Sequence, residues 1–343
     1  MSLTLHIDQK EFDKSLIKSL ESYENSIIPV IKGNGYGIGR ENLAKKCKEL
    51  NISSIAIGTI FEAKDLINSD LTEIIVMDPI KESDKEAFNK LRELSNKKIV
   101  LTISDVSDVS HIGNSPVIVE ILTSMNRFGI PIYELNQLKN LNVKAFSLHL
   151  PIDKSGNEKL SEIELIIKKL ADLNFSCNEI HLSHISDIQF KELINKYPNY
   201  KFKNRLGTKF WLNNMKVFQI KSTVLEVHDI ANQSFGYRQR KINAANLLIV
   251  SGGTAHGVGL QAPRSNTNLK SRITAIVSGI LEAFDLNLSP FIVSGKQRFF
   301  AESPHMNVSM LKLPVSITPP KVGSEITASL RMTTTNFDEV IFN

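Results

Sequence analysis

The chain has little cysteine and no long apolar run. Its 343 residues include two cysteines, Cys47 and Cys177, and one tryptophan. Two thiols are too few for a disulfide framework, and by themselves they cannot form a zinc site. No apolar stretch approaches the roughly 20 residues that a membrane helix requires. The first residues, MSLTLHIDQKEF, lack the basic and then apolar segments of a secretory signal. We therefore expect a reduced cytoplasmic protein.

The chain also lacks a strong charge of one sign. Its 41 lysines and arginines exceed the 36 acidic residues by five, and no basic stripe is present. Nucleic acid is therefore a poor candidate partner, although the pI near 9.0 suits small anionic ligands. Apolar residues make up 42% of the chain and charged residues 22%, a composition typical of a folded protein. The length suggests two domains, or a barrel of about 250 residues with an appendage.

Short apolar runs alternate with longer amphipathic segments from residue 27 to about 212. The runs are β-branched at successive positions, as expected of strands covered on both faces. Apolar residues spaced three and four apart predict helices between them. The predicted strands are 26–32, 54–58, 73–77, 98–103, 117–122, 143–148, 179–183 and 202–207, and the predicted helices include 41–50, 61–67, 84–94, 133–141 and 162–173. This alternation indicates an α/β fold with a closed parallel (β/α)₈ barrel, and an open doubly wound sheet is the alternative.

The pattern changes after residue 212. Apolar runs separated by glycine, proline, asparagine and serine predict a mostly β second domain. The first segment, SLTLHI, predicts a strand that joins this domain, because a helix begins before the first barrel strand. The barrel is therefore predicted to occupy residues 12–212, and the second domain residues 1–11 plus 213–343.

Reactive side chains gather at the predicted carboxyl ends of the strands, where barrel enzymes hold their chemistry. Lys32 ends the first strand and opens the segment KGNGYGIG, which has four glycines in eight residues. An amine buried at such a position gives up its proton more readily and can then form a Schiff base with an aldehyde. Glycines let the backbone approach a bulky ring or a phosphate closely. Other predicted strand ends carry Arg127, His149, Ser183, Ser186, Arg205 and Gly207.

The segment VIKGNGYGIG (30–39) resembles the V-x-K-A-N-A-Y-G-H-G signature of the alanine racemases, barrel enzymes that use pyridoxal phosphate. Further segments are similar to family motifs in the same order along nearly the whole chain. They are MNRFG (125–129), FSLHL (146–150), NRLGTKFWL (204–212), SFGYRQR (234–240), HMNVSM (305–310), VGSEI (322–326) and TTNFDEV (334–340). The resemblance implies a divergent racemase of this family, with a barrel and a C-terminal mostly β domain.

The resemblance also implies a cofactor site for pyridoxal 5′-phosphate. Lys32 would carry the cofactor covalently and act as a base on one face of the substrate Cα. Tyr36 would contact the phosphate group. The backbone of Gly207 and Thr208 would complete the phosphate site together with Ser183 or Ser186. A serine close to a strand end is equally expected as a simple helix cap. No metal is implied.

Arg205 would face the pyridine nitrogen by the same resemblance. A fixed cation does not readily give that nitrogen a proton, so the ring remains a weaker electron sink, which favours racemisation over transamination. A salt bridge at the barrel end is the structural alternative for this arginine. His149 would stack on the cofactor or orient Arg205, and a satisfied core histidine is the alternative.

The second base must lie on the opposite face of Cα. We favour Tyr237, which aligns with the family's Gly-Tyr, because Arg238 and Arg240 follow closely and positive neighbours stabilise a phenolate. An ungapped alignment would instead place Phe235 there, which has no titratable proton. In the family this tyrosine comes from the other subunit. The resemblance therefore implies a homodimer with shared active sites.

Several residues depart from the family pattern. Glu120 stands where the family often has a lysine, sometimes carbamylated, and we expect it to pair with Arg127, which would lie near the substrate carboxylate or the phenol. Opposite charges about 4 Å apart attract by roughly 4 kcal/mol at an effective dielectric near 20, before desolvation. A plain buried ion pair is the alternative. Met306 is retained as a substrate-pocket residue, but Asn307 replaces an aspartate and Phe337 replaces a tyrosine, so strict alanine specificity is in question.

The sequence thus predicts a racemase that interconverts L- and D-alanine, or a related small or basic amino acid, by two-base proton exchange. Supply of a D-amino acid for peptidoglycan is implied by the resemblance alone. One rival is a barrel-type decarboxylase, which would need a glutamate in place of Arg205. The other is a non-catalytic carrier of pyridoxal phosphate that lacks a working second base.

Overall fold

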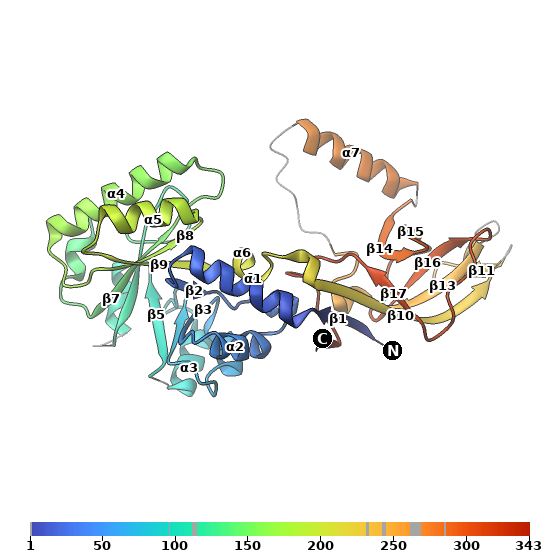
Figure 1. Ribbon diagram of the computed structural model, residues 1–343, viewed down its shortest axis with the longest axis horizontal. Coiled ribbons are helices and arrows are strands. Elements are labelled where there is room, and N and C mark those ends of the chain that lie inside the picture. The colour runs from blue at the N-terminus through green and yellow to red at the C-terminus, as the bar shows by residue number, and fades with distance from the viewer. Residues whose placement is uncertain are drawn as a thin grey trace. The chain divides into compact units, whose positions relative to one another are not determined.

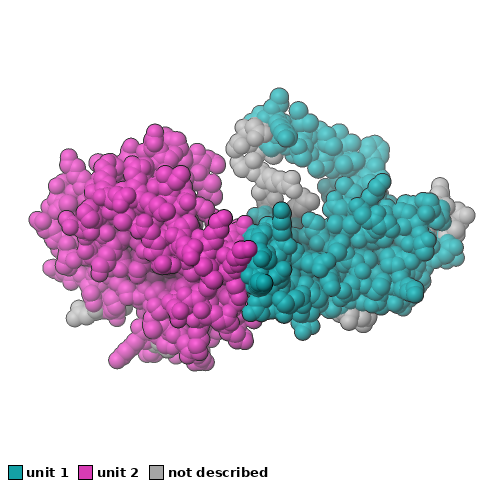
Figure 2. All heavy atoms as spheres, in the orientation of Figure 1, with its two compact units in different colours: residues 1–12, 36–38, 214–343 teal, residues 13–35, 39–213 magenta. Residues whose placement is uncertain are grey.

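The computed structural model describes residues 2–343 except 96, 112–114, 231–232, 242–244, 261–268 and 285. The chain divides into two compact units (Figure 2). The barrel unit comprises residues 13–35 and 39–213, and the β unit comprises residues 1–12, 36–38 and 214–343. None of the helices formed by the described residues is long and apolar enough to cross a membrane.

The barrel unit is built on a parallel sheet of eight strands in the order β2-β9-β8-β7-β6-β5-β4-β3 (Figure 1). Its strands are β2 (Ile27–Pro29), β3 (Ser54–Ile57), β4 (Glu73–Val76), β5 (Ile99–Ile103), β6 (Val117–Ile121), β7 (Val143–His149), β8 (Glu179–Ser183) and β9 (Lys201–Leu206). The two ends of the sheet meet, because the Ile31 N–H donates to the Ala56 carbonyl at 2.7 Å and Val30 bridges to Ala56. The predicted (β/α)₈ barrel is therefore confirmed.

The barrel interior contains a cluster of apolar side chains, the apolar layer. It consists of Ile28, Val30, Ala56, Ile75, Val100, Ile118 and Ala145, all of them buried. Because side chains alternate along a strand, the residue two positions later on each strand points into the same interior. Glu120 follows Ile118 in this way and Ser147 follows Ala145, and the two lie in register on adjacent strands. The fold thus brings polar side chains together above the apolar layer.

The helices of the barrel unit follow the predicted pattern in part. They include α2 (Arg40–Glu49), α3 (Lys85–Leu94), α4 (Gly156–Leu173), α5 (Asp187–Lys196) and α6 (Thr208–Trp211), and α1 (Gln9–Ser22) precedes β2. The α-helices predicted at 61–67 and 133–141 are wrong, since the chain forms the 3₁₀ turns η2 (Ile60–Asp65) and η4 (Leu135–Leu138). In η2 the buried Ile60 and Ala63 are three residues apart, the spacing at which a 3₁₀ turn aligns side chains.

The β unit is built on a second sheet of eight strands. These are β1 (Leu3–Ile7), β10 (Phe218–Asp229), β13 (Ala245–Ser251), β14 (Leu288–Val293), β15 (Lys296–Phe300), β16 (Val308–Pro314), β17 (Glu325–Ala328) and β18 (Glu339–Phe342). The amino-terminal strand β1 lies between β10 and β18, antiparallel to the first and parallel to the second. A separate hairpin joins β11 (Ser234–Phe235) to β12 (Arg240–Lys241), and helix α7 covers Leu269–Ala283 (Figure 1).

Candidate active site

Lys32 lies at the carboxyl end of the barrel, where it follows β2. Its side chain is exposed, so the desolvated lysine expected from the sequence is wrong for this structure. The reason is its place in the chain, three residues beyond Pro29, the last residue of β2, and past the apolar layer. Gly33 and Gly35 adopt positive φ angles of 61° and 62°. A Cβ on Gly35 would lie 2.5 Å from the backbone nitrogen of Arg40, so only glycine fits there.

Side chains from the neighbouring connection hold this loop. The carboxylate of Glu62 accepts hydrogen bonds from the N–H groups of Gly33 and Gly58, both at 2.7 Å. The guanidinium of Arg40 donates to the Gly33 carbonyl and pairs with Asp65. Sequence analysis missed these three side chains. Their positions in the sequence were the one sign that they belong to the site. Arg40 follows the glycine segment directly, and Glu62 and Asp65 come soon after β3.

Arg205 is a buried cation in the barrel interior. Its side chain is 3% exposed, and its Nη1 lies 3.6 Å from an oxygen of Glu120, which also accepts a hydrogen bond from Ser147. Burial lowers the pKa of Arg205, and attraction to Glu120 offsets part of that effect. Among the described residues, Nε and Nη2 of this guanidinium are buried and have no hydrogen-bond partner. Two strong donors are therefore held ready for an acceptor.

The expected pair between Glu120 and Arg127 is wrong. Glu120 is 5% exposed and points into the barrel, where its ionic partner is Arg205. Arg127 lies six residues beyond the end of β6 and is exposed, with its guanidinium 5.0 Å from the ring of Phe128. The sequence places the two residues close along the chain, but the alternation of the strand turns Glu120 into the interior, and the loop leaves Arg127 exposed where its charge acts on His149 and Arg205.

The buried pair of Glu120 and Arg205 gives a direct stability prediction. We expect Arg205→Met alone to cost about 3–5 kcal/mol, because it leaves the Glu120 carboxylate buried without its cation. The double variant Glu120→Leu, Arg205→Met should recover most of that loss, since it removes both charges together. Urea unfolding of the three proteins measures both effects. A double variant no more stable than the single one would contradict the assignment of this pair.

Two histidines stand at the mouth beside this arginine. The rings of His149 and His184 meet edge to face with centroids 5.0 Å apart, and Ser183 Oγ lies 3.1 Å from His149 Nδ1. Burial and the positive charges of Arg205, Arg127, His184 and Lys32 lower the pKa of His149 to about 3. Burial, Lys159 and Arg205 likewise lower the pKa of His184. The mouth is therefore cationic, and it suits anionic groups such as phosphate and carboxylate.

The neutral state of His149 should appear in the pH dependence of stability. With a folded pKa of about 3 and an ordinary value of 6.5, only the unfolded chain takes up this proton between those values. The free energy of unfolding should therefore fall as pH decreases below 6.5. We expect His149→Gln to lose about 1 kcal/mol less than the wild type between pH 7 and pH 5, allowing for its partly exposed ring. Equal losses in urea unfolding would refute this prediction.

His181 is a buried residue of the site that sequence analysis did not single out. Its Nε2 lies 2.8 Å from Glu179, which also pairs with Lys203 at 2.9 Å. Burial raises the pKa of Glu179, but hydrogen bonds from His181 and Lys203 outweigh that effect and lower it to about 2. Burial lowers the pKa of His181 itself. In the sequence, one feature points to His181. It stands two positions before Ser183 on β8, so both side chains lie on the same face of the strand.

The two candidate phosphate serines have different roles. Ser186 is the N-cap of α5, where its Oγ accepts from the Gln189 N–H at 3.2 Å as part of a capping box. Ser183 is buried on β8 and hydrogen-bonds to the Leu148 carbonyl and to His149. Gly207 and Thr208 begin the short helix α6 directly after β9. The capping role of Ser186 matches the alternative raised from the sequence, while Gly207, Thr208 and Ser183 stay predictions for the phosphate.

The remaining predicted residues belong to the β unit. Tyr36 is buried, with a left-handed φ of 56°. Phe337 lies close to Gly37, the residue after Tyr36. A Cβ placed on Gly37 would lie 3.0 Å from the Phe337 ring. Met306 is 72% exposed, and the carbonyl of Asn307 accepts from the Gly252 N–H at 2.9 Å. No group of three or more potential metal-ligating side chains occurs among the residues described.

The two candidates for the second base differ sharply in burial. Phe235 packs in an apolar cluster with Ile230, Leu247 and Ala301. Tyr237 is 85% exposed at the turn of the β11–β12 hairpin. The hairpin thus uses the phenylalanine as its anchor and presents the tyrosine to its surroundings. Only Tyr237 is free to meet a ligand.

Known proteins that are similar to this chain include alanine racemases. The family model described as "Alanine racemase, N-terminal domain" matches residues 14–193, more than half of the chain. The chain is 24% identical to the alanine racemase of Fusobacterium nucleatum over 259 residues, which cover 68% of this chain and 70% of that protein. It is 25% identical to the alanine racemase of Borreliella burgdorferi over 205 residues, 54% of each chain.

Solved structures show the same fold at low identity. Alanine racemase from Bartonella henselae, with covalently bound pyridoxal phosphate, is 14% identical and superimposes with a TM-score of 0.70 over the full length of both chains. Alanine racemase from Bacillus anthracis, with bound L-Ala-P, is 16% identical, with a TM-score of 0.70 over 99% of this chain and 87% of that one. A parallel barrel, a C-terminal β unit and the match of the family model together show that the chain belongs to the alanine racemase family.

Proposed function

We propose that this protein is a pyridoxal-phosphate-dependent racemase that inverts the Cα of a small amino acid. The observation that carries the proposal is Arg205, a buried cation with two donors that lack a partner among the described residues, at the same end of the barrel as Lys32. A guanidinium in that state suits a neutral aromatic nitrogen, which accepts a hydrogen bond and keeps no proton of its own. This arrangement disfavours the decarboxylase alternative, which requires a carboxylate at that position.

The residues present fit the cofactor in chemistry. Lys32 offers an exposed amine for covalent attachment, and Arg205 offers donors for the pyridine nitrogen. The cationic mouth and the backbone at Gly207 and Thr208 would hold the phosphate. Tyr36 is our proposal for the tyrosine that contacts it. Pyridoxal phosphate, when bound, supplies an electron-poor ring that stabilises negative charge at Cα.

Two bases on opposite faces of Cα would carry out the inversion. One takes the Cα proton, and the conjugate acid of the other delivers a proton to the opposite face, so the reaction needs no oxidant or reductant. We assign these roles to Lys32 and Tyr237. The burial of Phe235 in the hairpin core supports Tyr237 over the ungapped alternative. We also propose that the cation of Arg127 lies near the substrate carboxylate or the phenol, and that Met306 is a residue of the substrate pocket.

Tyr237 would serve the active site of a second copy of the chain. Its side chain is 85% exposed on a hairpin of the β unit, as expected for a residue donated to a partner. We therefore propose a homodimer with shared sites, in which residues 1–11 plus 213–343 complete the partner's active site. Alanine is the proposed substrate, because the matched relatives carry that name. Supply of D-alanine for peptidoglycan in the cytoplasm follows as part of the proposal.

The proposal is tested by following the Cα proton. The purified protein with pyridoxal phosphate is incubated with single L-amino acids in deuterated water, and both deuterium content and chirality are measured. We expect exchange at Cα together with inversion, most rapidly for alanine. Loss of carbon dioxide would instead identify a decarboxylase. Cofactor binding without exchange for any amino acid would identify a non-catalytic carrier and refute the proposal.

A further inference from the structure

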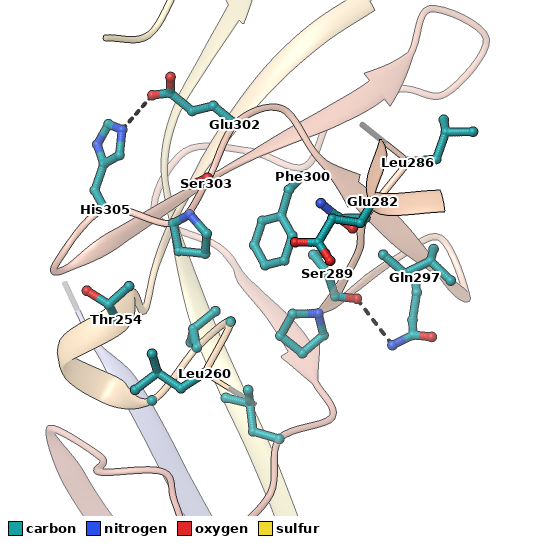
Figure 3. Close-up of a pocket in the computed structure, with 18 of the residues that line it drawn as sticks. Thr254, Leu260, Glu282, Leu286, Ser289, Gln297, Phe300, Glu302, Ser303 and His305 are labelled. Atoms are coloured by element: carbon teal, nitrogen blue, oxygen red, sulfur yellow. Dashed lines mark hydrogen bonds and ion pairs between the residues drawn. The ribbon is translucent and has the colours of Figure 1, made fainter. Parts of the chain in front are cut away.

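A carboxylate and an imidazole form a close pair next to the hairpin that carries Tyr237. Glu302 and His305 lie in the connection between β15 and β16, and His305 Nε2 is 2.5 Å from Glu302 Oε1 (Figure 3). The Glu302 side chain is 7% exposed and that of His305 is 20% exposed. The carboxylate therefore fixes which imidazole nitrogen faces it and how the ring is oriented.

This pair touches the hairpin at two points. The ring centroids of His305 and Tyr237 are 4.5 Å apart, with the ring planes inclined at 40°. The preceding Gly236 has a φ of 71°, and a Cβ there would lie only 2.2 Å from Glu302 Oε2. The carboxylate thus packs directly against the backbone of the turn, where any side chain would collide with it. Because Gly236 has no side chain, the Glu302 carboxylate can approach the backbone here.

The contacts matter because the Tyr237 side chain is largely exposed. The residue is 85% exposed, and His305 is the aromatic ring that packs against it. Both residues line an open hollow of about 1350 Å³ in the β unit, together with Glu302, Met306 and Glu282. An exposed tyrosine samples several rotamers, whereas a proton-transfer group has to be held close to one geometry.

We propose that Glu302 and His305 act as a clamp that positions the phenol of Tyr237 for proton exchange at Cα. The inference rests on the proposed function, and it assigns a role to Glu302, which lies outside the family-like segments, and to His305, to which the sequence analysis gave no role. His305 restricts the phenol ring by stacking, and Glu302 holds His305 and supports the turn at Gly236. Neither side chain takes the Cα proton, which passes between Cα and the Tyr237 oxygen. They are positioning residues.

The first experiment reads the position of the ring without catalysis. Fluorotyrosine placed at position 237 gives a ¹⁹F signal in the intact protein. We expect His305→Ala to shift this signal toward that of free fluorotyrosine, and His305→Phe to restore part of the original shift, because it keeps a stacked ring. Glu282→Gln is the matched control, since it neutralises another carboxylate lining the same hollow. An unchanged signal in His305→Ala would overturn the clamp even if the protein proves inactive.

The second experiment measures proton removal by Tyr237 separately from proton removal by Lys32. L- and D-alanine have equal free energies, so kcat/KM has to be the same in both directions and cannot report on one base. The primary isotope effect of Cα-deuterated substrate can differ between directions. We expect His305→Ala and Glu302→Gln to lower kcat by about 10- to 10²-fold. The isotope effect should rise only in the direction in which Tyr237 removes the proton.

The outcomes separate the clamp from simpler explanations. Equal changes of the isotope effect in both directions, with loss of cofactor absorbance, would show a general structural defect and overturn the positioning role. Isotope effects matching those of Glu282→Gln would overturn it as well. A wild-type protein that exchanges no Cα proton refutes the proposed function, and the ¹⁹F measurement then decides whether the ring is clamped.

Discussion

Lys32→Ala is expected to lower racemisation by more than about 10⁴-fold, at or beyond the upper limit of what one positioned base contributes. The variant loses both the proposed base and the amine that would hold the cofactor. Its fold should be unaffected, because Lys32 is exposed beyond the end of β2 and the apolar layer lies below it. Racemisation of L-alanine, followed by chiral chromatography, measures the effect.

The matched control for this variant is Lys45→Ala, which removes an exposed lysine from α2 of the same barrel. It should retain full activity. Borohydride reduction of the wild type with pyridoxal phosphate, followed by peptide mass mapping, should find the label on the peptide containing Lys32. A label found elsewhere, or a Lys32→Ala variant that still racemises alanine, would remove the basis of the proposed chemistry.

Tyr237→Phe is expected to lower racemisation by about 10²- to 10⁴-fold, since it deletes one proton but keeps the ring and its contact with His305. The absorbance of lysine-bound pyridoxal phosphate should be unchanged, because the variant leaves the barrel unit as it is. Exchange of the Cα proton into solvent should persist more strongly than inversion, since Lys32 still acts on its own face.

Tyr133→Phe provides the control, because Tyr133 is another exposed tyrosine at 79% and lies in the barrel unit. It should behave as the wild type. If Tyr237→Phe retained full activity, Tyr237 would not be the second base. If the wild type bound the cofactor and neither protein exchanged the proton, the chain would be a carrier.

The barrel could be predicted from the sequence because each of its strands carries its own local signal. A strand such as Val117–Ile121 is apolar at every position except Glu120, and buried parallel strands require that pattern. The helix predicted at 162–173 also forms, but it begins earlier, at Gly156, where Ser155 forms a capping box with Glu158. The 3₁₀ turns could not be predicted, since short apolar segments satisfy helical and 3₁₀ spacing almost equally well.

The partners within the site could not be predicted in the same way. The partner of Glu120 depends on how far the side chain of Arg205 reaches across the interior, which no local pattern encodes. The contact between His305 and Tyr237 joins residues 68 positions apart through the turn of a hairpin. Motif resemblance predicts which residues belong to the site, but three-dimensional packing decides which of them meet.

The pairing of the first barrel strand, β2, with the last, β9, sets a condition on when the site can form during synthesis. Ile28, four residues before Lys32, pairs with Arg205 across the seam, so the amine and the guanidinium lie at opposite ends of the barrel sequence. A nascent chain in which β9 has not yet emerged contains Lys32 but lacks the strand that carries Arg205. Such a chain cannot assemble the proposed site, because Arg205 has not yet taken its place beside β2.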